Sequence, residues 1–545
     1  MIRNFISFWT LLIALAAMSL FVGAEGSSVP RPSGSGPRRL ATGPLPDGRG
    51  TDDVVKLIAF LDSERDADKT SATPNNPEDS SEKVKRPPLS QKLLGNTSCT
   101  AAGCHGGVRP TNGIGGEYSL WLQNDPHAKA YSVLFSDLSQ RMVSQWQSQT
   151  KVEDRVPAHQ AGYCLSCHSP TANSTRLPAT CDGVGCEQCH GPAEQWIDRH
   201  VHPKWKTVST AEKSMLGFRN LHDVSERART CVECHMGINH DLIAAGHPRL
   251  SFEMSAFHAN MPAHWSRESD WARHIPDVKA DARPTQPVPV AELRRGRSNF
   301  EAKLWVAGQL ESLHFTTKLL GTRAGHAIDN SPHMPWPELV EWNCFACHHD
   351  LNGVSWRQSR STSTLAISKP SWNSWPLAMI NFLPAAGDEK HAQSAREGIT
   401  RLRDLIARPY PLPKQVYESA RSTQGELSWW ISAFRNQSFR GVAISSEAIN
   451  ELLHRMSGIE GEKLITENWD SATQVFLGLS ALTHAADAGN QEAQRIARMA
   501  ILNSMNETLN FPDGFDSPRS FSAEPIERLK DDLKRFHATL EAGKQ

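Results

Sequence analysis

Closely spaced cysteine pairs with a histidine directly after them recur along this chain. Four copies have the form Cys-x-x-Cys-His, and a fifth, wider copy has four residues between its cysteines. With 11 cysteines and 23 histidines in 545 residues, chance predicts only about 0.01 copies of the shorter form. The five copies occupy residues 99–105, 164–168, 186–190, 231–235 and 344–348.

Such a motif binds haem covalently, because its two thiols add to the haem vinyl groups and the adjacent imidazole becomes an axial ligand of the iron. The sequence therefore predicts five covalently attached haem c groups. The attachment residues would be Cys99, Cys104, Cys164, Cys167, Cys186, Cys189, Cys231, Cys234, Cys344 and Cys347. The proximal iron ligands would be His105, His168, His190, His235 and His348.

Other uses of cysteine pairs fit this spacing less well. Structural zinc also uses Cys-x-x-Cys pairs, but its remaining ligands lie a dozen or more residues away and no histidine need follow the second cysteine. Thioredoxin-like redox chemistry needs one such pair near a βαβ pattern. Disulfide frameworks are typical of small secreted domains, whereas this chain has 545 residues.

What occupies the iron face opposite each motif histidine decides between two functions. A second histidine closes the coordination sphere and favours outer-sphere electron transfer, whereas an open face admits a substrate. His127 is the strongest candidate for such a distal ligand, because Asp125 and Pro126 predict the start of a helix whose apolar period continues to residue 142. The further candidates are His200, His240, His247 and His314.

Two of these candidates have distinctive surroundings. His247 lies beside Gly and Pro, which predicts the end of a loop, and Arg249 just after it could pair with a haem propionate. His314 lies beside an apolar stripe over residues 306–320, so a packed core histidine is as good a reading as a ligand.

The N-terminus predicts export. Arg3, the apolar run over residues 5–22 and the small residues 22–24 form a signal peptide, residues 1–24. The run is almost long enough to span a bilayer, so an uncleaved anchor formed by residues 5–22 stays open as an alternative. Covalent haem attachment takes place outside the cytoplasm, which agrees with a periplasmic or otherwise extracytoplasmic protein.

Composition divides the rest of the chain into three parts. Residues 25–90 are rich in Gly, Ser, Pro and charge and predict a flexible linker. Residues 91–355 hold all eleven cysteines and predict a pentahaem cytochrome c domain of short helices with little strand. Residues 356–545 predict a helical C-terminal domain, because apolar stripes at helical spacing run through 427–434 and 469–486. The expected fold class is therefore mainly α.

Several segments resemble one family. Residues 183–194 resemble the Cys-Glu-x-Cys-His-Gly-Pro segment of multihaem c-type cytochromes of the cytochrome c-554 type, which share a broad group with hydroxylamine oxidoreductase-like cytochromes. Residues 127–131 and 247–250 are similar to other segments of that group, and the resemblance covers roughly residues 95–350. It implies haems in close stacked and perpendicular pairs, with His127 and His200 as distal ligands.

The chain also departs from these relatives. The cytochrome c-554 pattern has four haems rather than five. The Cys-x-x-Cys-Lys motif of the pentahaem nitrite reductases is absent from the sequence. With only five tyrosines and no evident partner motif, the chain gives little support to the tyrosine-crosslinked haem of hydroxylamine oxidoreductases.

We therefore predict an exported multihaem electron carrier rather than an enzyme. Its partners would be other redox proteins or a membrane electron-transport complex, and membrane contact would come through the N-terminal segment. Its 58 basic and 59 acidic residues leave no basic surface for nucleic acid. The alternative is a multihaem oxidoreductase of nitrogen or sulfur oxides with one five-coordinate haem.

Overall fold

The chain is mainly helical, as predicted. Within the described ranges the only β-structure is an isolated bridge between Trp342 and Trp372, and no helix there combines the length and apolar character needed to cross a membrane. The predicted signal peptide and linker lie outside the described residues, as do Cys347 and His348. The computed structural model describes residues 92–107, 115–148, 151–170, 183–278, 288–330, 335–344, 371–486, 492–509 and 523–542.

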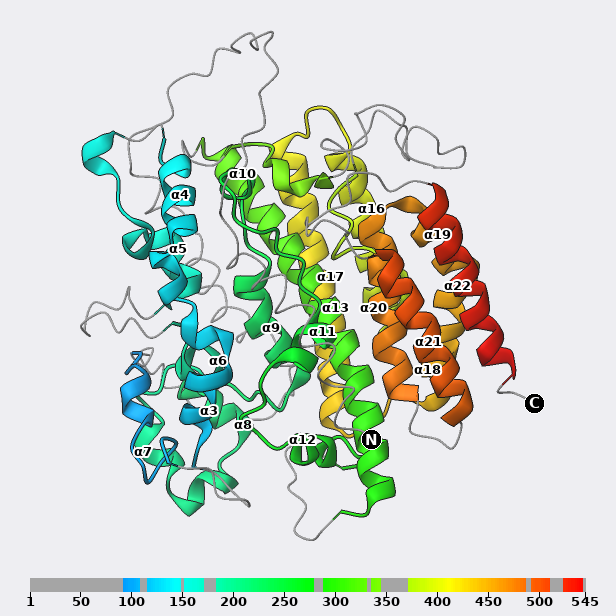
Figure 1. Cartoon of the computed structure of the whole chain (residues 1–545), viewed down its shortest axis with the longest axis horizontal. Helices are drawn as coiled ribbons and strands as arrows, with labels where there is room; N and C mark the ends of the chain where they lie inside the picture. The colour runs from blue at the N-terminus through cyan, green and yellow to red at the C-terminus, as the bar shows by residue number, and fades with distance from the viewer. Residues whose placement is uncertain are drawn as a thin grey trace, which may run out of the picture.

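Short helices joined by turns make up the N-terminal half (Figure 1). Glycine ends one of them: Gly191 follows α6 at a φ of 87°, and a Cβ there would lie 2.0 Å from the carbonyl oxygen of Gly217. The α-helices are α3 (Glu117–Asn124), α4 (Asp137–Trp146), α5 (Gly162–His168), α6 (Cys186–His190), α7 (Ile197–His200), α8 (Thr210–Met215), α9 (Val224–His235), α10 (His240–Ala244), α11 (Met254–Asn260) and α12 (Arg267–Arg273). The 3-10 helices in this half are η2 (Asn96–Cys99), η3 (Pro126–Lys129), η4 (Ser132–Phe135), η5 (Val152–Asp154), η6 (Ala158–Gln160) and η8 (Pro203–Thr207).

The helix predicted to start at Pro126 is shorter than expected. Asp125 does cap it, accepting a hydrogen bond from the backbone N–H of His127, but η3 ends after one turn. The apolar period continues in η4 and then α4, because the Ser136 hydroxyl accepts from the N–H of Ser139 and begins a new helix. His127 therefore lies on a short, capped turn.

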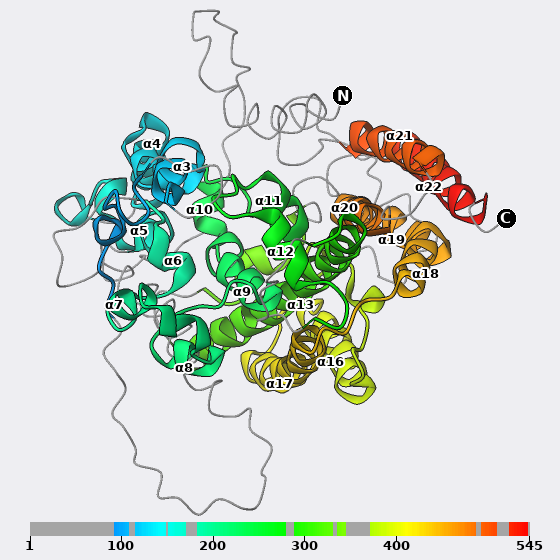
Figure 2. The ribbon, with the colours of Figure 1, turned by 90° about the horizontal axis from the view of Figure 1, so that it is seen from below.

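Long helices running side by side make up the C-terminal half (Figures 1 and 2). Helix α13 packs on α9 and α12 of the N-terminal half and on α17 and α20. The apolar stripes predicted from the sequence lie in α13, α17 and α20, where Leu310, Trp430 and Leu479 are among the buried side chains. The elements are α13 (Val290–Ile328), η9 (Leu339–Glu341), η10 (Ile380–Phe382), α16 (Glu389–Ile406), α17 (Pro413–Phe439), α18 (Ser446–Ser457), α19 (Ile459–Glu467), α20 (Trp469–Ala486), α21 (Glu492–Leu509) and α22 (Ala523–Glu541).

The apolar core crosses residue 355, where the sequence predicted a domain boundary. One continuous cluster joins Val232 of α9 and Leu310 of α13 to residues of α16 to α22. A buried ion pair reinforces the contact, since the Arg249 guanidinium donates to both carboxylate oxygens of Asp470, at 2.8 and 2.7 Å. The side chain of Arg249 is therefore engaged with Asp470, which argues against the propionate role considered for it above.

Candidate metal centres

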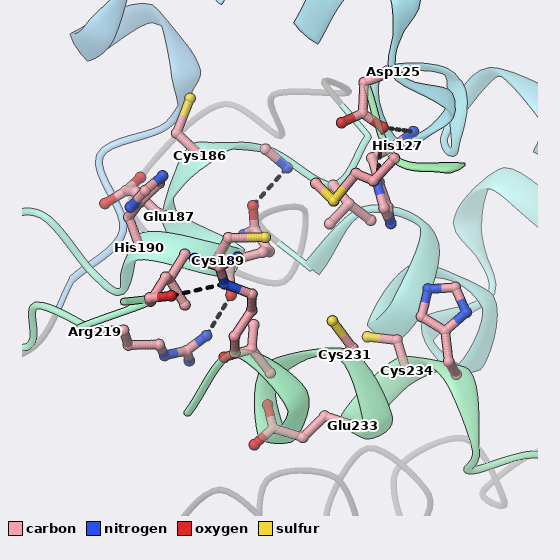
Figure 3. A pocket seen from close by; sticks show the side chains of 18 of the residues that line it. Asp125, His127, Cys186, Glu187, Cys189, His190, Arg219, Cys231, Glu233 and Cys234 are labelled. Atoms are coloured by element: carbon pink, nitrogen blue, oxygen red, sulfur yellow. Dashed lines mark hydrogen bonds and ion pairs between the residues drawn. The ribbon is translucent and has the colours of Figure 1, made fainter. Parts of the chain in front are cut away.

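A large cavity lies among the short helices of the N-terminal half and extends to α13 and α17. Its volume is about 4510 Å³, several times the roughly 300–1,000 Å³ of a pocket for one drug-sized ligand. All four motifs whose residues the structure describes in full contribute to its lining. Figure 3 shows part of it, with side chains of Cys189, Cys231 and Cys234 around the same space as His127. The cavity therefore has room for several large ligands next to one another.

Helix geometry positions the motif side chains. Helices α5, α6 and α9 each end at a motif histidine: His168, His190 and His235. Because residues three apart share one face of a helix, the two cysteines of each motif point the same way. The wider motif folds differently: η2 ends at Cys99, and a turn returns the N–H of His105 to the Cys99 carbonyl, at 3.3 Å.

Each of these four motif histidines lies beside a second histidine. Two imidazoles bound to opposite sides of one metal ion, with bonds of about 2 Å, place their ring centroids roughly 6 Å apart. The observed spacings all match this arrangement. The pairs are His105 with His200 (6.2 Å), His235 with His127 (6.0 Å), His168 with His247 (6.4 Å) and His190 with His264 (6.2 Å).

Hydrogen bonds at Nδ1 orient most of these rings. The Nδ1 of His127 lies 2.8 Å from Asp125 Oδ1, and that of His105 lies 3.1 Å from Glu117 Oε2. Because an acceptor at Nδ1 holds the proton there, the lone pair at Nε2 remains available to a metal ion. The same arrangement uses backbone carbonyls at three further rings: His168 with Ala130 (2.8 Å), His247 with Pro248 (2.8 Å) and His200 with Ile197.

Burial keeps several of these imidazoles neutral. It lowers the pKa of His190 to about 3 and that of His235 to about 4, and it also lowers the pKa values of His168 and His247. Only a neutral imidazole has a lone pair to give to a metal ion. These four rings are therefore ready to bind one at pH 7.

The motifs are close to one another. The thiol of Cys99 lies next to that of Cys186, and the thiol of Cys167 lies next to that of Cys234. The first motif thus adjoins the third, and the second adjoins the fourth. Groups attached at these cysteines would lie side by side in the cavity.

The structure separates the predicted distal ligands into two groups. It places His127, His200 and His247 beside motif histidines. His314 also lines the cavity, but its ring is paired with none of the four described motif histidines. Its Nε2 lies 3.1 Å from the Ser428 hydroxyl, and burial lowers the pKa of that ring to about 3. His314 therefore has the contacts of a packed helical histidine.

His264 is not among the distal ligands predicted from the sequence, yet the structure places it beside His190. His264 lies between α11 and α12, and its ring also packs edge-on to Trp265. Nothing in the local sequence separates it from His258, which instead accepts a hydrogen bond from Arg227 at Nε2, at 2.9 Å. Only the fold distinguishes these two histidines.

Of the fifth motif, the structure describes only Cys344. Glu338, just upstream of the motif, accepts a hydrogen bond from the backbone N–H of His240, at 3.0 Å. Cys344 and Ile238 line one small cavity. His240 therefore remains the predicted distal ligand for the fifth motif.

Paired imidazoles beside Cys-x-x-Cys-His cysteines are the arrangement that haem c requires of a c-type cytochrome. Residues 93–191, less than a fifth of the chain, match the family model of cytochrome c554 and c-prime, so this segment is similar to cytochromes of that type. Members of the family bind haem c covalently and carry electrons, and cytochrome c domains are typically extracytoplasmic. The matched segment contains three of the five motifs. No curated protein and no solved structure matches the chain.

Proposed function

We propose that this protein is an exported multihaem cytochrome that transfers electrons between redox partners by outer-sphere steps. The observation that carries the proposal is the pairing of all four described motif histidines with a second histidine, at 6.0 to 6.4 Å between ring centroids. Haem c, when bound, supplies a one-electron couple at each iron. With an imidazole on both faces, an iron has no position for a substrate, which favours electron transfer over catalysis.

The chain's own residues prepare these centres. Hydrogen bonds at Nδ1 hold His105 and His127 in one orientation, so little rearrangement accompanies a change of charge at a bound metal ion. Burial lowers the pKa of His190 and His235 and keeps both rings neutral. The contacts between Cys99 and Cys186 and between Cys167 and Cys234 bring neighbouring motifs together, which suits transfer from one centre to the next.

The proposal includes a fifth centre, at residues 344–348, with His240 as its distal ligand. Its support is the motif itself and the contact between Glu338 and the N–H of His240. Export rests on residues 1–24 and on the extracytoplasmic attachment of haem c. Redox proteins or a membrane electron-transport complex are the partners that this function requires.

Spectroscopy of the purified protein tests the function directly. A pyridine haemochrome assay should give five c-type haems per chain, the ferric spectrum should be fully low-spin, and carbon monoxide should leave the reduced spectrum unchanged. A high-spin band together with carbon monoxide binding would instead support the alternative, an oxidoreductase with one five-coordinate haem. Four haems per chain would remove the fifth centre from the proposal.

Ring orientation gives a finer test by electron paramagnetic resonance, because parallel and perpendicular imidazole planes give different low-spin ferric signals. The planes of His105 and His200 lie 12° apart, whereas the other three pairs lie at 70° to 88°. We expect one rhombic low-spin signal from the haem between His105 and His200, and strongly anisotropic signals from the haems at the other three pairs. His127→Ala should convert one haem to high spin. The matched variant His314→Gln should leave every haem low-spin. A high-spin haem in this variant would contradict the assignment of His314 as a packed residue that binds no iron.

A further inference from the structure

Three metal-ligating side chains meet at the C-terminal helices. His454 comes from α18, and His537 and Glu541 come from α22. One ligand atom from each lies within 4.8 Å of the others. None of the three lines the large cavity of the N-terminal half, so this cluster is separate from the haem centres.

The fold prepares the cluster for a metal ion. His537 and Glu541 are four residues apart on one helix, so both side chains project from the same face. Leu533 and Phe536 of α22 are buried in the same apolar core as Leu453 of α18, which fixes the two helices against each other. The donors are thus carried by rigid elements rather than by a loop.

The distances fit a small tetrahedral ion. Bonds of about 2.1 Å place neighbouring ligand atoms of a tetrahedral site roughly 3.4 Å apart. His454 Nδ1 and Glu541 Oε1 already lie 3.2 Å apart. The rings of His454 and His537 meet edge to face, with centroids 5.2 Å apart, so small side-chain rotations bring the third donor to the same ion.

A neighbouring hydroxyl orients the third donor. The Ser457 Oγ lies 2.9 Å from His537 Nδ1, which leaves Nε2 as the nitrogen of His537 that can reach a metal ion. Ligating histidines generally have such a partner at their other ring nitrogen. The His391–Glu426 pair, at 2.7 Å, offers a contrast, because it belongs to no three-donor group among the described residues.

We propose that His454, His537 and Glu541 form a binding site for a divalent transition metal, with zinc as the ion that this donor set fits. Two imidazoles and one carboxylate suit zinc, and a water would complete its four-coordinate shell. Calcium and magnesium require more oxygen donors than the site offers. A bound ion would tie α22 to α18 through coordination bonds in addition to their apolar contact.

Zinc titration of the haem-loaded protein tests the site. The haem-loaded form is essential, since motif cysteines without haem would themselves bind zinc. Isothermal titration calorimetry and elemental analysis after gel filtration should find one zinc per chain. His537→Ala and His454→Ala should abolish this binding, and Ser457→Ala should weaken it by roughly 10–100-fold. His391→Ala, the matched control, should bind zinc as the unmodified protein does.

Thermal unfolding provides an independent readout. Zinc should raise the unfolding temperature of the unmodified protein and of His391→Ala, because it binds only the folded state. It should leave that of His537→Ala unchanged, and the haem spectrum and circular dichroism of this variant should show that it is folded. The proposal would be overturned if the unmodified protein bound no zinc. It would also be overturned if His454→Ala and His537→Ala bound zinc as tightly as the unmodified protein does.

Discussion

Replacing Asp125 by asparagine should raise the reduction potential of the haem proposed at His127 and His235. The Asp125 side chain is buried, and its Oδ1 lies 2.8 Å from His127 Nδ1. Burial alone would raise the pKa of this carboxyl, but its hydrogen bonds with His127 lower it, so the group is ionised at pH 7. The anion makes the imidazole a stronger donor and favours ferric iron.

The size of the shift follows from the hydrogen bond. Bonds to charged groups contribute about 1.5–3 kcal/mol and neutral ones about 0.5–1.5 kcal/mol, so loss of the charge removes about 1–1.5 kcal/mol. For a one-electron couple a factor of ten, about 1.4 kcal/mol, equals about 59 mV. Asp125→Asn keeps the acceptor oxygen and the helix cap, and should therefore shift this haem by about 40–60 mV in the positive direction.

A redox titration followed by visible absorption and electron paramagnetic resonance measures this shift. The centre belongs to the strongly anisotropic class, because its ring planes are 88° apart. Asp154→Asn, which removes an exposed carboxylate, is the control for loss of charge alone and should leave the potentials unchanged. An unchanged or more negative potential in Asp125→Asn would refute the reasoning.

Three further perturbations test other parts of the structure. His264→Ala should convert the haem at His190 to high spin, seen in the ferric visible spectrum, and a fully low-spin spectrum would reject this ligand. Asp470→Ala leaves the charge of Arg249 buried and should lower the free energy of unfolding by about 3–5 kcal/mol in urea; an Arg249→Met/Asp470→Leu double variant should recover most of it. Burial lowers the pKa of His274 to about 3. Between about pH 6.5 and about pH 3, this imidazole therefore binds a proton in the unfolded chain but not in the folded one, so the free energy of unfolding decreases as the pH falls. His274→Asn should lose less stability between pH 7 and pH 4.5, and an equal loss would contradict this assignment.

The sequence allowed specific predictions where the relevant residues are close together along the chain. Residues 186–190 contain both attachment cysteines and the proximal histidine, and the structure places them on one short helix. The C-terminal helices were also predictable, because a period of 3.6 apolar residues, as in α20, depends only on neighbours along the chain. Local patterns therefore gave the fold class, and they also predicted the proximal ligands.

Which histidines come together depends on contacts that no local pattern encodes. His235 comes beside His127 across a long stretch of chain, and His190 beside His264 across another. The sequence singled out His127 because Asp125 and Pro126 mark a helix start, whereas His264 has no comparable signal. Arg249 shows the same limit, since its partner Asp470 lies in the other half of the molecule.

The two halves of the protein differ in what stabilises them. On the side of the cavity formed by α3 to α8, the buried apolar side chains among the described residues form small clusters, one of them centred on Leu134 and Leu165 and another on Tyr163 and Leu242. The C-terminal helices share one large continuous core with α9 and α13. Because apolar burial is the main favourable term in folding, the N-terminal half requires another source of stability, and covalently bound haem filling the cavity would provide it.

This difference predicts how the chain behaves without its cofactor. A variant with serine at every motif cysteine should lose the order of the short helices α3 to α8 and keep the long helices, since these have their own core. Limited proteolysis should then cleave the variant within residues 92–223 and leave a resistant fragment that contains α13 and α16 to α22, identified by mass spectrometry. The haem-loaded protein should resist cleavage in both halves. Equal resistance of the two halves in the serine variant would show that the N-terminal half folds without haem, and would contradict the argument from its small apolar clusters.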